Sequence, residues 1–281
     1  MALRIQNNVE AFNAHRNLTK TAANAAKSME KLSSGFRVNR AADDAAGLAI
    51  SEKMRSQIGG LAQAQRNAQD AVSLVQTGEG ALNEVHSMLQ RVRDLKVQHS
   101  NGTLDTQDKE AISAEVQQLA KEISDIQSKT EFNGIKLLNA GSVTFQVGSE
   151  AADTITLTKT DLSAAIGSGG LSEITGVGSA ASVTAADTAF TALTIDNIDS
   201  AIKNVSTARS TFGAVQNRLE HRLNNLSTYQ ENLVASESRI RDVDMADEMV
   251  NFTKQGILQQ AGTSMLAQAN QSSQGVLSLL R

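Results

Sequence analysis

The chain lacks three residue types altogether: it has no cysteine, no proline and no tryptophan. Without cysteine, disulfide bonds, thiolate metal sites and cysteine nucleophiles are all excluded. Proline, which usually makes up about 5% of a protein, kinks or ends helices, so its absence leaves long helices uninterrupted. Aromatic residues are only 3% of the 281 residues, and because aromatics bury the most area per side chain, a thick globular core is not expected. These absences favour long helices around a thin aliphatic core.

Strong charge and long apolar runs are also missing. The net charge of −4 gives no electrostatic reason to expect binding to nucleic acid or to an anionic membrane. No stretch approaches about 18 consecutive apolar residues, so no membrane span is predicted. Residues 1–10 lack the apolar core of a signal peptide, so an exported chain would need a dedicated exporter that reads another signal.

The clearest pattern lies in the N-terminal half, where apolar or small residues recur at alternating spacings of three and four. This heptad pattern predicts a coiled-coil seam. Asp43 or Asp44 is a suitable N-cap before it and Asn101-Gly102 a stop signal after it, so we expect one helix over residues 45–99. Such a helix would be roughly 80 Å long. The seam includes Leu61, Val75, Leu82, Val85, Leu89 and Val92.

Two further helices are predicted by the same spacing. One covers residues 104–129, with Asp105 or Thr106 as its cap and Asn133-Gly134 as its end signal. The other covers about residues 205–243, and its seam is broken only at Arg222 and Ser236. Because each seam buries one stripe, the long helices should pair antiparallel, with the 104–129 helix completing a bundle. The second seam includes Phe212, Val215, Leu219, Leu226 and Leu233.

The middle of the chain changes from a helical to an alternating pattern. Val143, Phe145 and Val147 alternate with polar residues, as do Ile155 and Leu157, which predicts short strands with turns near residues 140–141 and 148–153. Residues 163–189 consist mostly of Ala, Gly, Ser and Thr, so we expect a loose excursion there.

These patterns predict a mainly α fold. We expect a long antiparallel helical rod, or coiled-coil bundle, with the terminal helices pairing at one end and a small excursion containing a β-hairpin in the middle. The predicted domains are a terminal coiled coil (residues 1–42 plus 241–281), a helical rod (43–140 plus 191–240) and a short variable β and loop excursion (141–190).

The two terminal segments carry scattered apolar residues in a matrix of Asn, Gln, Thr and Ala. Two such helices bury too little surface to offset their ordering entropy alone. We therefore predict that they are disordered in the free chain and fold on assembly. The candidate self-assembly residues are Leu3, Ile5, Val9, Phe12, Val250, Ile257, Leu258, Leu277, Leu279 and Leu280.

Two passages resemble a known family. Residues 32–50 read LSSGFRVNRAADDAAGLAI, and residues 229–246 read YQENLVASESRIRDVDMA, continuing to residue 280. Both are similar to the terminal signatures of bacterial flagellins, and the resemblance covers about residues 1–140 and 195–281. The chain departs from the family pattern at residues 271–274, where a proline is usual, and at Gly78, where alanine is common.

The resemblance implies a structural subunit of the extracellular flagellar filament, used for swimming. It implies that terminal helices form concentric tubes around a channel, with the variable middle facing outward. It also implies passage, unfolded, through the flagellar type III export apparatus, and an export chaperone, cap proteins and hook-associated proteins as partners besides other copies of the chain.

The family resemblance also extends to a site read by Toll-like receptor 5 of animal innate immunity. The matching residues are QRVRDL at 90–95, with Glu115 on the neighbouring helix. The implied receptor contacts are Arg91, Leu95 and Glu115. The alternative is that Arg91 and Arg93 are ordinary solvated or subunit-interface charges.

Reactive constellations are missing from the sequence. The four histidines are far apart and form no HExxH motif, the acidic residues at 242–248 lack EF-hand spacing, and the Gly-rich stretches at 167–170 and 176–178 lack the P-loop lysine. No catalytic residue, metal or cofactor is therefore predicted. The rival interpretations are a flagellar hook–filament junction protein, an intracellular coiled-coil adaptor, which would form a stable dimer with ordered ends, and an embedded hydrolase.

Overall fold

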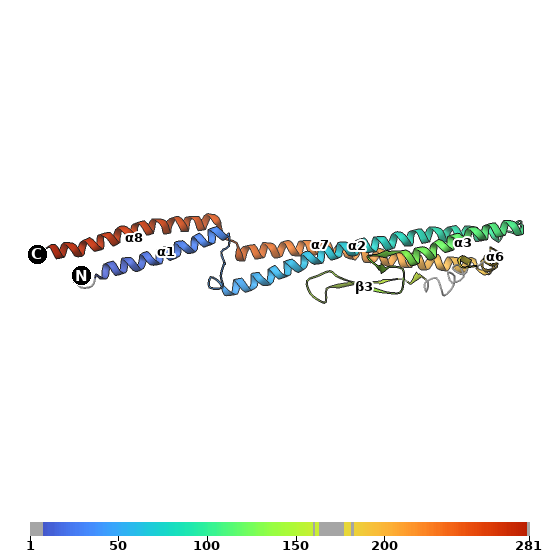
Figure 1. The fold of residues 1–281 in the computed structure, drawn as a ribbon, viewed down its shortest axis with the longest axis horizontal. Coiled ribbons are helices and arrows are strands. Elements are labelled where there is room, and N and C mark those ends of the chain that lie inside the picture. The colour runs from blue at the N-terminus through green and yellow to red at the C-terminus, as the bar shows by residue number, and fades with distance from the viewer. Residues whose placement is uncertain (1–7, 160, 163–176, 181–182, 280–281) are drawn as a thin grey trace. The chain divides into compact units, whose positions relative to one another are not determined.

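The computed structural model describes residues 8–159, 161–162, 177–180 and 183–279 (Figure 1). The chain divides into two compact units, unit 1 with residues 1–58 and 231–281 and unit 2 with residues 59–230. The described part of the chain is mainly helical, as predicted, with two small antiparallel hairpins. None of the described helices is long and apolar enough to cross a lipid bilayer.

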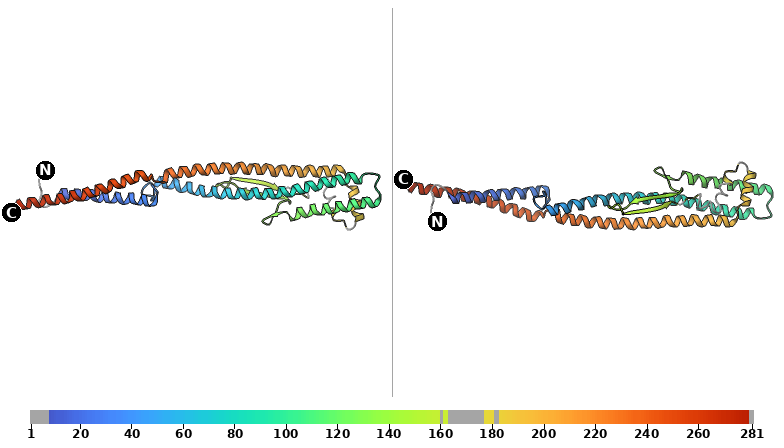
Figure 2. Two further views of the ribbon diagram at one scale, coloured as in Figure 1. Left: turned by 90° about the horizontal axis from the view of Figure 1, so that it is seen from above. Right: turned by 90° about the horizontal axis from the view of Figure 1, so that it is seen from below.

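Unit 1 contains the two terminal helices, α1 (Val9–Ser34) and α8 (Met245–Leu279). The Asn8 side chain caps α1 by accepting a 3.0 Å hydrogen bond from the Ala11 amide, and Gly35 ends the helix with φ of 74°. Asp244 caps α8, since its Oδ1 accepts a 2.9 Å bond from the Ala246 amide. The two helices run side by side in both figures and contact each other extensively (Figures 1 and 2).

The longest helix, α2 (Ala45–His99), has the boundaries that the sequence predicts. Asp44 is the N-cap, because its Oδ1 accepts a 2.9 Å hydrogen bond from the Gly47 amide. The helix ends just before the predicted Asn101-Gly102 stop signal.

Helices α3 (Thr106–Lys129) and α7 (Ile195–Arg241) share the core of unit 2 with α2. Two ion pairs set the antiparallel register of α7 against α2: Arg209 lies 3.6 Å from Glu79, and Arg93 lies 2.6 Å from Asp199. The residue number on α7 falls as that on α2 rises, so the two helices are antiparallel and their seams face each other.

The prediction that Asn133-Gly134 ends the third helix is wrong. Helix α3 already ends at Lys129, and the two residues instead form the turn between β1 (Glu131–Phe132) and β2 (Ile135–Lys136). Asn133 and Gly134 have φ of 47° and 78°. This double left-handed conformation is the one that a two-residue hairpin turn requires, and Asn-Gly adopts it most readily.

The predicted strands form a second hairpin, β3 (Gly141–Gln146) with β4 (Thr154–Lys159). The strands are antiparallel, with Val143 opposite Leu157 and Phe145 opposite Ile155. Arg222, at a predicted break in the α7 seam, holds the turn of this hairpin. Its guanidinium donates 3.1 Å to the Val147 carbonyl and lies 2.9 Å from Asp153.

The prediction of a loose excursion over residues 163–189 is wrong for its last part. Residues 183–192 form helix α6 (Val183–Ala192), which packs against α3 and buries Ala186 and Phe190. Alanine has the highest helix propensity, and one Ala/Phe stripe is enough to dock a short helix. Residues 163–176 and 181–182 lie outside the described part of the chain.

Candidate self-assembly surface

The faces that α1 and α8 turn toward each other consist mainly of small or polar residues. On α1 the less exposed positions step alternately by three and four: Ala11, Ala14, Leu18, Thr21, Ala25, Ser28 and Leu32. On α8 they are Glu248, Phe252, Gln255, Gly262, Leu266 and Ala269. Each set is a heptad seam, but one that buries few large side chains. The seam was not predicted, although the three-and-four spacing on α1 is readable in the sequence once alanine is counted as apolar.

The contacts between α1 and α8 run along the helices but involve few large side chains. Leu18 packs against Gly262, and the Asn8 side-chain amide donates 2.9 Å to the Ala269 carbonyl. A groove of about 710 Å³ remains between the helices, lined by residues of both. The pair therefore resembles an incompletely filled interface.

Many large apolar side chains of α1 and α8 are exposed, in addition to the few that lie in the α1–α8 seam. Phe12 is 70% exposed and Val250 is 68% exposed. We call the described, exposed apolar residues of the two helices the outward face; two of them, Leu258 and Met265, also border the groove between the helices. The outward face comprises Val9, Phe12, Met29, Met245, Met249, Val250, Ile257, Leu258 and Met265. Of the predicted self-assembly residues, Leu3, Ile5 and Leu280 lie outside the described chain, as do the side chains of Leu277 and Leu279.

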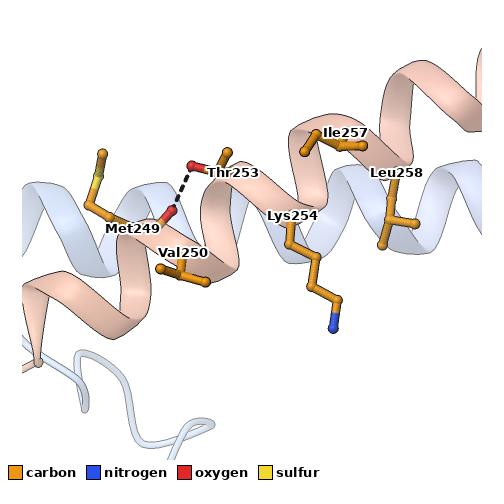
Figure 3. A pocket seen from close by; sticks show the side chains of 6 residues that line it. All are labelled: Met249, Val250, Thr253, Lys254, Ile257 and Leu258. Atoms are coloured by element: carbon orange, nitrogen blue, oxygen red, sulfur yellow. Dashed lines mark hydrogen bonds between the residues drawn. The ribbon is translucent and has the colours of Figure 1, made fainter.

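Exposed apolar side chains occur on more than one side of helix α8, interspersed with polar ones. Figure 3 shows Val250, Ile257 and Leu258 pointing in different directions from one stretch of it, around a shallow hollow of about 460 Å³ that Met249 also lines. Lys254 is the last charged residue of the helix. Large apolar side chains that stay exposed on more than one side of a helix in a single chain indicate a missing partner.

Two arginines, Arg37 and Arg241, link the segments that connect the terminal helices to α2 and α7. Arg37 donates to the Arg239 and Ile240 carbonyls at the C-terminal end of α7, at 3.2 and 2.7 Å. Arg241 stacks 4.5 Å over the Phe36 ring and lies 3.1 Å from Glu52 of α2. A guanidinium at a helix C-terminus satisfies orphan carbonyls and opposes the helix dipole.

All predicted rod-seam residues except Leu233 lie in the interior of unit 2. Leu61, Val75, Leu82, Val85, Leu89, Val92, Phe212, Val215, Leu219 and Leu226 are buried, and Leu233 is partly exposed. Their partners across the seam include Ile123 of α3 and Leu157 of β4. The β-hairpin and α3 thus share one continuous core with α2 and α7.

The implied receptor contacts separate into two groups. Arg91 and Glu115 are exposed and form an ion pair, with Nη2 and Oε1 2.7 Å apart. Leu95 is only 2% exposed and belongs to the core. The side chain of Leu95 is therefore inaccessible in the free chain, whereas the receptor contact itself stays a prediction. The helical drift of the seam from Val92 carries position 95 inward.

A buried polar cluster ties α6 to α2 and α3. Asp187 Oδ1 accepts two hydrogen bonds of 2.8 Å, from His99 Nε2 and from Ser113 Oγ. The Lys96 ammonium donates 2.7 Å to the Phe190 carbonyl near the end of α6. Lys96 and His99 are each 6% exposed and Ser113 is fully buried. Sequence reasoning placed His99 on the continued seam, but its partner is 88 residues away and could not be identified.

The pKa values of Asp187 and Lys96 in this cluster are both lowered, but for different reasons. Burial would raise the pKa of Asp187, but the hydrogen bonds from His99 and Ser113 outweigh it and hold the pKa below its usual value. Burial lowers the pKa of Lys96, with a smaller opposing effect from Asp187. No group of three or more metal-binding side chains occurs in the described residues, so this cluster serves packing, with no sign of a metal centre.

Comparison with known proteins covers the whole chain. Residues 5–143 match the bacterial flagellin N-terminal helical region, and residues 195–280 match the bacterial flagellin C-terminal helical region. Flagellin of Halalkalibacterium halodurans is 54% identical over 99% of both chains, and flagellin of Bacillus subtilis is 48% identical over 99% of this chain and all of that one. A solved structure described as a flagellar hook-associated protein of Vibrio parahaemolyticus covers 71% of this chain and all of its own, with TM-score 0.54 and 16% identity, and shows a shared fold alone.

Proposed function

We infer that this chain, which belongs to the bacterial flagellin family, is a structural subunit that polymerises with other copies of itself into a flagellar filament. The observation that carries the inference is the outward face of α1 and α8. Large apolar side chains that a single chain leaves in water mark an interface. Full-length likeness to two flagellins supports other copies of the chain as the partner.

The energetics of the terminal pair favour folding coupled to assembly. The α1–α8 seam is small and leaves a groove, so the pair gains little from folding alone. Burying the outward face against neighbouring copies would contribute about 25 cal/mol for each Å² of apolar surface removed from water. Assembly therefore supplies the stabilisation that the isolated pair lacks.

The rest of the chain would serve as a scaffold for the terminal helices. We assign the filament core to residues 1–42 and 241–281, the rod to residues 43–140 and 191–240, and the outer surface to residues 141–190. The continuous aliphatic core of unit 2 supports a stiff, packed element. The role is structural, with no catalytic step.

Export completes the proposed function. A filament subunit must leave the cell, and we propose that this one travels unfolded through the flagellar type III apparatus, with an export chaperone, and assembles under cap proteins beyond hook-associated proteins. The absence of cysteine supports this route, since an unfolded chain without thiols cannot be trapped by a disulfide. The proposed location is the extracellular filament.

A receptor contact is proposed at the Arg91–Glu115 pair. Both side chains are accessible on the single chain, at 54% and 44% exposure. Monomer carrying Arg91→Ala should stimulate cells that express Toll-like receptor 5 less than wild type does. Lys129→Ala, which removes another exposed, paired charge of unit 2, is the control. Equal stimulation by Arg91→Ala and wild type would end this part of the proposal.

Seeded polymerisation tests the proposed function directly. Purified monomer mixed with short filament seeds should give long filaments of uniform diameter in negative-stain electron micrographs. A chain that stays monomeric even with seeds and precipitant would point to a junction protein, and a stable dimer would point to an adaptor; either would overturn the proposal.

A further inference from the structure

The methionines of this chain are concentrated where the proposed assembly takes place. Of the seven in the sequence, Met29, Met245, Met249 and Met265 are all on α1 or α8 and are 50–61% exposed. Met54 and Met88, on α2, are partly buried. We call the four exposed residues the outward methionines. Their thioethers are accessible to solvent in the free subunit and, on the proposed function, are covered in the filament.

Two of the outward methionines line hollows on the terminal helices. Met249 borders the shallow apolar hollow on α8, next to Val250 (Figure 3). Met265 borders the groove between α1 and α8, near Leu258. An unbranched, polarizable thioether adapts to an irregular apolar surface, so methionine suits a hollow that a second copy must fill.

We propose that the outward methionines are a modification site, at which oxidation to the sulfoxide blocks addition of the subunit to a filament. This inference rests on the proposed function. The oxidant is a peroxide: its O–O bond breaks, one oxygen forms an S–O bond, the sulfur loses two electrons, and hydrogen peroxide leaves as water. The product is a polar sulfoxide in place of an apolar thioether.

The block follows from the place of these residues. In the free subunit the sulfoxide oxygen is hydrated and costs nothing. A contact between copies at the mostly apolar α8 hollow would remove that water, and Thr253 and Lys254 are the only lining side chains there that carry donors, which penalises the assembled state. Lys254 is the one charged donor bordering the α8 hollow, and charged residues are absent from the rest of α8 beyond it. Oxidation should therefore raise the critical concentration for polymerisation by at least about tenfold.

The rate of oxidation of the outward methionines should also depend on whether the subunit is free or assembled. Because the outward methionines are covered in a filament, peroxide should oxidise free subunits faster than assembled ones. Reduction by methionine sulfoxide reductases restores the thioether, so the block is reversible.

The experiment compares subunits with and without hydrogen peroxide treatment, with sulfoxides located by mass spectrometry and filaments pelleted after seeding. Treated wild type should fail to polymerise at concentrations where untreated wild type succeeds. A variant with Met29, Met245, Met249 and Met265 all replaced by leucine, a volume-conserving change, should polymerise with or without treatment. The control variant Met54→Leu/Met88→Leu should remain as peroxide-sensitive as wild type.

A second measurement is independent of these variants: incubation of treated wild type with methionine sulfoxide reductases should restore polymerisation. If wild type carrying all four sulfoxides polymerises like the untreated chain, or if the four-leucine variant is equally sensitive, the proposal is overturned. Should untreated wild type itself fail with seeds, the proposed function falls, and this inference with it.

Discussion

Gly78 is the residue at which helix propensity and packing conflict most directly in α2. Family likeness suggests alanine there, and alanine would favour the helix by about 1 kcal/mol. However, a Cβ at this position would lie 2.4 Å from the Phe212 ring of α7. Phe212 is one of the two largest fully buried side chains, so it cannot move aside at low cost.

We therefore predict that Gly78→Ala lowers the free energy of unfolding, because overpacking a filled core costs about 1–3 kcal/mol and outweighs the gain in propensity. Gly80→Ala, two residues along the same helix with open space around it, should instead stabilise the chain by about 1 kcal/mol. Denaturant unfolding of both variants checks this. A stabilising Gly78→Ala would mean that Phe212 repacks freely.

Asp187 should make unit 2 sensitive to acid. Its pKa is lower in the folded chain than the usual value of 3.8, so its contribution to stability is complete above that pH and is lost as the pH falls through the folded value. Asp187→Asn should lower the free energy of unfolding at neutral pH by about 1–3 kcal/mol, because buried hydrogen-bonding groups lose their charged partner.

The difference between wild type and Asp187→Asn should shrink as the pH falls below 3.8, measured by denaturant unfolding across pH. Asp199→Asn, which removes the exposed partner of Arg93, is the matched control and should have a smaller effect. A difference that stays constant down to strongly acidic pH would show that the carboxylate charge of Asp187 contributes nothing.

The seams could be predicted from the sequence because a heptad pattern needs only the spacing of apolar residues along one helix. The polar cluster could not, since Lys96 and His99 meet Asp187 only through the fold. The burial of Leu95 could not be predicted for a related reason. A resemblance identifies which residues match, whereas burial depends on which neighbours pack over them.

At the scale of elements, the boundaries of α2 agree with the predicted helix of about residues 45–99, because an Asp N-cap and an Asn-Gly stop bracket an unbroken seam. Asn133-Gly134 carries a similar dipeptide but forms a hairpin turn, and local chemistry alone does not distinguish the two uses. Helix α6 was missed because its composition resembles a linker. Its docking depends on Phe190, which packs edge-on against His99 at 5.1 Å between ring centroids.

Helices α2, α7 and α3 pair through a continuous row of buried apolar residues, so we expect one charged substitution in that row to disrupt the whole pairing. Leu89 is fully buried in the middle of it. Leu89→Asp should unfold unit 2, because it places an unpaired charge in an apolar core that offers no partner. Circular dichroism and thermal unfolding would show the loss. Val97→Asp, at a position of the same helix that is 51% exposed, should leave the helices folded. Cooperative, wild-type unfolding of Leu89→Asp would contradict the proposed core.

At the scale of the whole molecule, the two units differ in how their apolar residues are used. Unit 2 buries its large apolar side chains in its own core, with Phe190 and Phe212 fully enclosed. The terminal helices of unit 1 instead face each other mainly with small or polar residues and leave many large apolar side chains exposed. We therefore expect unit 2 to act as a folded scaffold and the terminal helices of unit 1 to provide the self-assembly surface.

The role of the terminal helices in assembly is tested most directly by truncation. Residues 1–30 or residues 250–281 are removed, and folding and polymerisation of each truncated chain are measured separately. Each truncated chain should keep the cooperative unfolding of unit 2, followed by circular dichroism, and should give no filaments with seeds under conditions in which the full chain does. Normal filaments from either truncation would contradict the central claim that the outward face of α1 and α8 drives assembly.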